Sequence, residues 1–216
     1  ISDDNDLQAY FNEISRVSIL CKQLDLSLNA TKTQEMLFCT KRDKPESATL
    51  QLDGVDIELC DNVKYLGVLI DNKLRFESHV DNLVTKASQR MHIVRTFCYT
   101  STKLLSSMLF KSFIISILTY CLPILYTSIY AKDKKRLRKF FKDANRLSIE
   151  NISDLDSIID NRTKNLILNY IHDDEHFIND LLPKLPSGRY RTMKYRSSWG
   201  RDSFLRSMIL SLNNIL

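Results

Sequence analysis

The chain has 216 residues, of which 44% are hydrophobic and 26% are charged. That length allows one sizeable core, or one large and one small domain, and the composition excludes a disordered chain. Only four Gly and four Pro are present, which predicts long regular elements, and the net charge of +5 favours a polyanionic partner weakly.

The five cysteines predict reduced, buried thiols. Their number is odd and no two form a CxxC pair, so a zinc clamp is not expected. The first six residues are acidic, without a signal peptide or an initiator Met. We therefore expect an intracellular protein, nuclear or cytoplasmic and not secreted, and either a fragment or a chain whose start lies upstream.

The first 60 residues predict a helix followed by extended segments. Apolar residues at helical spacing mark one stripe: Leu7, Tyr10, Phe11, Ile14, Val17, Cys21 and Leu24. Asp3-Asp4 suits the helix dipole better than a metal site. Residues 26–33 read as a turn that contains Lys32, and residues 35–39 as a strand. Residues 50–59 predict a hairpin, because Asp53-Gly54 is a preferred type I′ turn pair.

A short apolar run, residues 63–70, predicts one buried strand. Gly67 lies within this run, and a glycine inside a strand often marks the close approach of another backbone or a ligand. Together with the hairpin, this strand is expected to form a small antiparallel sheet of about three strands, with one face against helices.

From Arg75 onward the pattern predicts only helices. The first is amphipathic to about Val94 and carries Lys86 and Arg90 on its polar face. A second is expected from Ser101-Thr102 to about Tyr120. Residues 104–126 are apolar, but Lys111 and Pro123 interrupt the run, so a buried core helix is expected and a membrane span is not.

Residues 131–147 predict a strongly basic helix. Leu137, Phe141 and Ala144 belong to its inward stripe. Such a charge run is often a solvated face, and a nuclear localisation signal or an anionic membrane surface would use the same composition; the density favours a polyanion. The basic residues are Lys132, Lys134, Lys135, Arg136, Arg138, Lys139, Lys142 and Arg146.

The last part of the chain predicts a helix over 155–170 and a closing helix over 205–212. His172 and His176 lack a third ligand, so no metal site is expected. Between the helices, basic residues alternate with Tyr and Trp, which suits nucleic acid or an arm docked on its own domain. These basic residues are Arg189, Arg191, Lys194, Arg196 and Arg201.

The order of these motifs resembles the distal palm and thumb of reverse transcriptases from non-LTR (LINE-type, jockey-like) retrotransposons. The resemblance rests on the segments LSLNATKT and EMLF, then the hairpin, then NVKYLGVLIDNKLRFESHV. A tail with LPSGRYR and RSSWGRDSFLRSMILSLNN is similar to the C-terminal motif of such proteins. The resemblance covers nearly the whole chain.

The resemblance implies roles for particular residues. Lys32 would lie near the incoming nucleotide and could act as a general acid toward departing pyrophosphate. Lys64, Tyr65, Leu66 and Gly67 would form the primer grip. The basic helices would follow the phosphates of a template–primer duplex without reading its sequence. The implied partners are RNA template, DNA primer (an RNA–DNA hybrid) and the upstream fingers and palm.

The chain departs from this family at the catalytic centre. Polymerase chemistry needs paired aspartates that hold two divalent ions. Asp3-Asp4 lacks the preceding aromatic residue and apolar strand, so we expect no catalytic carboxylates and no cofactor in this fragment; Mg²⁺ would serve only the parent polymerase. The chain alone is expected to be inactive.

The expected architecture is therefore α+β. Residues 1–74 would form a palm remnant, residues 75–150 a thumb-like helical bundle and residues 151–216 a helical region with a basic arm. Three functions remain open: a remnant of a retrotransposon polymerase, a host nucleic-acid-binding adapter derived from one, and a helical module that binds acidic protein partners.

Overall fold

The protein was analysed as a computed structural model that describes residues 4–38, 50–52, 54–98, 100–146, 153–173, 175–192, 194–195 and 198–213. The chain divides into two compact units, Ile1–Lys73 and Leu74–Leu216. The expected division at 74/75 and 150/151 stays a prediction.

The first unit is built on helix α1, Asp4–Gln23, which confirms the predicted opening helix. Tyr10, Phe11 and Ile14 pack against a small core of Leu50, Leu52 and Ile57. The predicted hairpin is also present: β1 (Gln51–Leu52) pairs antiparallel with β2 (Val55–Asp56). Gly54 has a φ of 78°, as the predicted turn requires, while Asp53 lies outside the described residues.

The run expected to be one buried strand is a second hairpin. Strand β3 (Asn62–Tyr65) pairs antiparallel with β4 (Val68–Asp71), and Tyr65 lies opposite Val68. The chain reverses at Leu66 and Gly67, whose φ angles of 45° and 87° are both positive, as in a type I′ turn. The single-strand prediction is wrong because Leu-Gly lacks the usual Asn or Asp turn signal. The described sheets are thus two pairs of strands instead of one sheet of three.

The strand expected over residues 35–39 is reduced to one parallel bridge in the described residues. Glu35 pairs with Leu59, with hydrogen bonds from Glu35 N to Glu58 O (3.1 Å) and from Cys60 N to Glu35 O (2.8 Å). Just before it, residues Ala30–Lys32 form a 3₁₀ turn, η1. Cys39 lies outside the described residues.

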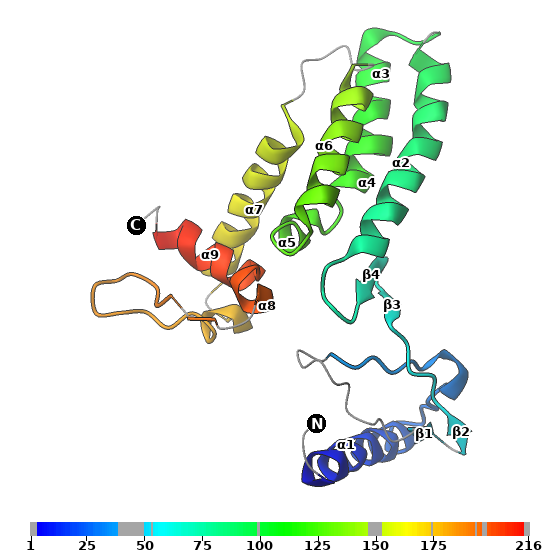
Figure 1. The fold of residues 1–216 in the computed structure, drawn as a ribbon, viewed down its shortest axis with the longest axis vertical. Helices are drawn as coiled ribbons and strands as arrows, with labels where there is room; N and C mark the ends of the chain where they lie inside the picture. Colours follow the sequence, from blue (N-terminus) through cyan, green and yellow to red (C-terminus); the bar gives the residue numbers. More distant parts are fainter. Residues whose placement is uncertain are drawn as a thin grey trace. The chain divides into compact units, whose positions relative to one another are not determined.

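The second unit is a bundle of helices (Figure 1). Its long members are α2 (Glu77–Cys98), α6 (Ala131–Asn145) and α7 (Leu155–His172). Helix α2 packs against α6 and against the segment made of α3 (Lys103–Phe110), the π-helical turn η2 (Lys111–Ile115) and α4 (Ser116–Leu118). Helix α7 packs against α5 (Leu122–Leu125) and α6. The fully buried side chains here include Phe110, Ile114, Leu118, Leu122 and Leu137.

A further core lies where the C-terminal helix meets α7. Helix α9 (Phe204–Asn213) contributes Met208, Ile209 and Leu212, which cluster with Ile167 of α7. Between α7 and α9 lie the 3₁₀ turn η3 (Phe177–Asn179) and α8 (Ser198–Arg201). These elements confirm the predicted α+β class with small antiparallel sheets and a large helical region.

The most apolar segment is only partly a core helix. Thr102 caps α3, as expected, by accepting a hydrogen bond from Leu105 N (3.4 Å). Ser106, Ser107 and Phe110 are buried, whereas Leu104 and Met108, expected to face inward, are exposed. The segment Lys103–Leu125 is long and apolar enough to cross a membrane by length and composition, but soluble core helices pass the same test, so this alone assigns no span.

The β3–β4 turn predicts a stabilising substitution. Leu66 holds a left-handed conformation that costs an L-residue roughly 1–2 kcal/mol, and its side chain is 74% exposed, so little packing would be lost. Leu66→Asn should raise the free energy of unfolding of the full chain by about 0.5–1 kcal/mol in urea denaturation. Leu26→Asn, at an exposed residue without a positive φ, should give no gain. A loss of stability in Leu66→Asn would show that the leucine makes contacts that outweigh its backbone cost.

Candidate nucleic-acid interface

The four expected primer-grip residues form the tip of the β3–β4 hairpin. Tyr65 is 63% exposed and Leu66 74% exposed, and Lys64 precedes them on β3. Strained backbone and exposed apolar side chains together are typical of binding sites. The hairpin therefore exposes Tyr65 and Leu66 to solvent, while their role on a primer stays a prediction.

Lys32 occupies the last position of the η1 turn and is exposed. Asn29 organises this turn, because its carbonyl oxygen accepts hydrogen bonds from the backbone N–H groups of Lys32 and Thr33, both at 3.1 Å. The backbone of Lys32 thus belongs to a hydrogen-bonded turn, and its side chain is exposed to solvent. Its general-acid role stays a prediction.

Helix α6 is amphipathic, with Leu137, Phe141 and Ala144 buried. Several of its basic side chains are held by the rest of the bundle. Lys132 pairs with Glu77 and Arg136 with Asp81, both on α2. These two cations therefore already have ion-pair partners within the protein, and the pairs join α6 to α2.

Two more basic residues of α6 belong to a network around Tyr126. The Arg138 guanidinium donates two hydrogen bonds to Asp156, at 2.7 and 2.9 Å, and this lowers the pKa of Asp156. The Tyr126 hydroxyl also donates to Asp156 (2.6 Å), and burial raises the pKa of Tyr126. The Lys134 ammonium lies 5.0 Å from the centre of the Tyr126 ring, and burial lowers its pKa. Arg138 and Lys134 thus make stabilising contacts within the fold, in addition to any contact with a ligand.

The remaining cations of α6 form what we call the basic stripe: Lys135, Lys139, Lys142 and Arg146. The three lysines are exposed and have no ion-pair or hydrogen-bond partner in the part of the chain that the structure describes. Arg146 has Asp143 at 3.5 Å and a side chain that is largely exposed. Spacings of four, three and four residues place all four on one helix face, opposite the buried side, over about 16 Å. The basic stripe is the surface of α6 most available to a polyanion.

The two candidates on α2, Lys86 and Arg90, are exposed as expected. The Arg90 guanidinium lies 5.8 Å from the centre of the Phe113 ring of η2. Arg90 therefore has an intramolecular cation–π contact, which leaves its donors accessible to a further partner.

The segment expected to be a basic arm is packed onto its own unit at Tyr190. This side chain is buried in the cluster with Ile167 and Met208, and its backbone exchanges hydrogen bonds with Asn213 at 2.8 and 2.9 Å. Arg189 and Arg191, on either side, are exposed. Lys194 and Arg201 are exposed as well, and Arg196 lies outside the described residues. The aromatic residue thus anchors the segment and its neighbouring cations face solvent.

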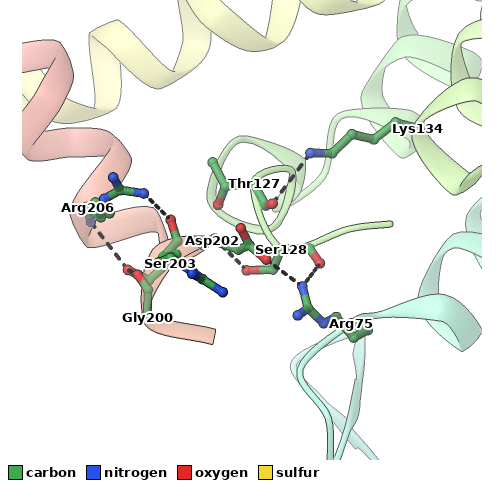
Figure 2. A network of polar contacts seen from close by, with 9 residues as sticks. Arg75, Thr127, Ser128, Lys134, Gly200, Asp202, Ser203 and Arg206 are labelled. Carbon is green, nitrogen blue, oxygen red and sulfur yellow. Dashed lines mark hydrogen bonds and ion pairs between the residues drawn. The ribbon is translucent and has the colours of Figure 1, made fainter. Parts of the chain in front are cut away.

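Sequence reasoning missed the contact between Arg75 and Asp202 (Figure 2). The Arg75 guanidinium donates to Asp202 Oδ2 (2.9 Å) and to the carbonyl oxygen of Ser128 (3.3 Å), and the Ser128 hydroxyl donates to the carbonyl oxygen of Asp202 (3.1 Å). The Arg75 side chain is only 14% exposed. A separation of 127 positions in the chain offers no sequence signal for this pair.

A close approach at Gly200 shapes the same region. A Cβ atom there would lie 2.2 Å from the Tyr195 side chain, so only glycine fits this arrangement. The carbonyl oxygen of Gly200 accepts a hydrogen bond from the Ser203 hydroxyl (2.7 Å) just before α9 begins. Asp202 is therefore held on a compact turn.

Removing the charge of Asp202 should destabilise the second unit. Asp202→Asn replaces the ion pair of the nearly buried Arg75 with a neutral contact, which should cost about 1–2 kcal/mol in urea denaturation. Asp180→Asn is the matched control, because Asp180 is exposed and has no ion pair among the described residues; it should change stability by less than about 0.5 kcal/mol. Equal stabilities of the two variants would mean that the Arg75 contact contributes little.

Asp156 should give the protein an acid-dependent component of stability. Because its folded-state pKa is lowered, its carboxylate stabilises the fold above its ordinary pKa near 4, and the contribution is lost as pH falls through the lower, folded-state value. Asp156→Asn should therefore be less stable than wild type at pH 6, and the difference should shrink below about pH 4. Asp160→Asn, on the exposed side of α7, should track the wild type throughout. A difference that is constant with pH would contradict the proposed role of the carboxylate.

The comparisons with known proteins give one partial similarity. Over 89 residues, 41% of its length, the chain is 32% identical to the probable RNA-directed DNA polymerase from transposon BS of Drosophila melanogaster. The matched residues span 10% of that protein. No protein-family model matches the chain, and no solved structure matches it. The chain therefore contains a reverse-transcriptase-related region.

Proposed function

We propose that the chain is the C-terminal part of a non-LTR (LINE-type, jockey-like) retrotransposon reverse transcriptase, comprising distal palm, thumb and tail. In this proposal it binds the template–primer, an RNA–DNA hybrid, and works together with upstream fingers and palm. The partial similarity to a transposon polymerase supports the parent activity. The observation that carries the binding role is the basic stripe of α6.

The stripe suits a nucleic-acid backbone because its charges are lined up and its three lysines have no ion-pair partner among the described residues. Four cations lie along about 16 Å of one helix face, so several phosphates in a row can be neutralised together. Such contacts release counterions and do not read bases, as expected for a polymerase that copies any sequence.

The hairpin tip and the η1 turn complete the proposal. Exposed Tyr65 and Leu66 offer apolar surface that could hold the sugar and base at a primer end, with Lys64 beside them for a phosphate. Lys32 would act on pyrophosphate only in the complete polymerase.

Polymerisation itself is not assigned to this chain. The two Mg²⁺ ions of the parent polymerase require paired carboxylates, and within the described ranges no group of three or more His, Cys, Asp or Glu residues could hold a metal ion. Since Asp3-Asp4 lacks the preceding aromatic residue and apolar strand of the family's catalytic motif, no step through the metal is proposed for this chain. Binding without turnover is the expected activity.

The basic stripe can be tested by salt-dependent binding to a labelled RNA–DNA hybrid. Lys139→Ala with Lys142→Ala should lower the affinity roughly five- to tenfold per removed contact near 0.1 M salt and reduce the slope of log K against log salt by about 0.9 per contact. The matched control, Lys132→Ala with Arg136→Ala, removes the same charge from cations paired with α2 and should have a smaller effect on the slope.

Two outcomes would contradict the proposal. Equal slope changes in both double variants would mean that only net charge matters, and absence of hybrid binding at low salt would remove template–primer binding altogether. The latter result would favour a helical adapter without an enzymatic parent role.

A further inference from the structure

Five large apolar side chains lie exposed where α2 ends and α3 begins. They are 45–64% exposed, which is unusual for clustered aliphatic and aromatic groups in a folded unit. The two helices pack side by side (Figure 1). The exposed side chains at the end of α2 and those at the start of α3 therefore lie at the same end of the helix pair. We call this set the α2–α3 apolar surface: Ile93, Phe97, Leu104, Leu105 and Met108.

Helix α3 is inverted with respect to an ordinary surface helix. It buries Ser106 and Ser107 and exposes Leu104, Leu105 and Met108. The hydroxyl groups of both serines have no hydrogen-bond partner among the described residues, which costs stability. Folding alone favours the opposite arrangement, with leucine inside and serine outside. The outward leucines therefore point to a function other than packing of this unit.

Charge around this surface has one sign. Residues 82–131 include five basic residues and no Asp or Glu. On α2, Lys86, Arg90, Ile93 and Phe97 follow spacings of four, three and four, so they share one face, basic at one end and apolar at the other. The contact of Arg90 with Phe113 aligns the basic part of α2 with the end of α3, near Lys111. The surface is thus apolar at the helix ends and basic further along.

We propose that the α2–α3 apolar surface binds an acidic amphipathic helix of a partner protein. Its apolar residues would cover Phe97, Leu104 and Met108, and its carboxylates would face Lys86 and Arg90. The 4-3-4 spacing on α2 is the spacing at which a second helix packs. A nucleic acid would satisfy the cations but leave the leucines and Met108 exposed, so a protein segment is the better complement. This inference is independent of hybrid binding by the basic stripe.

The test uses the full chain and three fluorescent helical peptides that share one apolar stripe but carry Glu, Gln or Lys on its rim. The Glu peptide should bind at least tenfold more tightly than the Gln peptide, with no binding of the Lys peptide. Leu104→Ser with Met108→Ser should weaken Glu-peptide binding at least tenfold. Leu181→Ser with Leu210→Ser, at exposed leucines elsewhere in the unit, is the matched control and should leave it unchanged.

A charge exchange tests the proposal independently, in case the serine variant fails to fold. Lys86→Glu with Arg90→Glu should reverse the preference, so that the Lys peptide binds and the Glu peptide does not. Equal binding of the Glu and Gln peptides, no binding of any peptide, or no effect of Leu104→Ser with Met108→Ser would each overturn the proposal.

The same variants separate other partners from this one. If the serine variant weakens binding to the RNA–DNA hybrid or to phosphatidylserine vesicles and leaves peptide binding intact, the surface belongs to nucleic acid or lipid and the proposal is wrong. Loss of hybrid binding in the Lys139 and Lys142 variant with normal peptide binding concerns the basic stripe alone, so the two proposals can fail separately.

Discussion

One nearly buried guanidinium connects the first and last parts of the helical unit. Arg75 stands at the start of the unit and Asp202 close to its end, and the side chain of Arg75 is only 14% exposed. Exposed ion pairs contribute little because solvent competes with them, whereas an enclosed cation that loses its partner keeps its desolvation cost. The contact also involves the carbonyl oxygen of Ser128, so it joins three segments of the chain at one point (Figure 2).

The same competition between internal acceptors and solvent divides the cations of α6 into those paired within the protein and those that face water. Composition predicts eight equivalent basic residues, but the fold supplies carboxylates for some of them from α2 and α7. The stripe that remains is set by geometry: it faces away from the buried side, and its three lysines have no ion-pair partner among the described residues. A binding surface is thus defined here by what the bundle leaves unpaired.

Sequence patterns predicted the elements whose signals are local. Helices α1, α2, α6 and α7 follow a clear apolar period, and the β1–β2 hairpin follows from Asp53-Gly54. The β3–β4 hairpin could not be predicted because its turn uses Leu66, a residue that avoids positive φ unless the structure imposes it. Of the candidate site, the positions of the cations were predictable. Their availability was not, since Lys132 pairs with Glu77 and Arg136 with Asp81, each 55 positions away in the chain.

Helix α3 shows a limit of a different kind. Its leucines and Met108 share one face and its two serines lie on the other, so amphipathic periodicity selects the wrong face as the buried one. Side-chain size offers a physical reason for the choice, because serine permits a closer approach between neighbouring backbones than leucine does. That choice leaves Leu104 and Met108 in water, at a cost of the order of 1 kcal/mol or more for each side chain. A fold that accepts this cost, together with unbonded serine hydroxyls, is better matched to a bound state in which the leucines are covered than to an isolated chain.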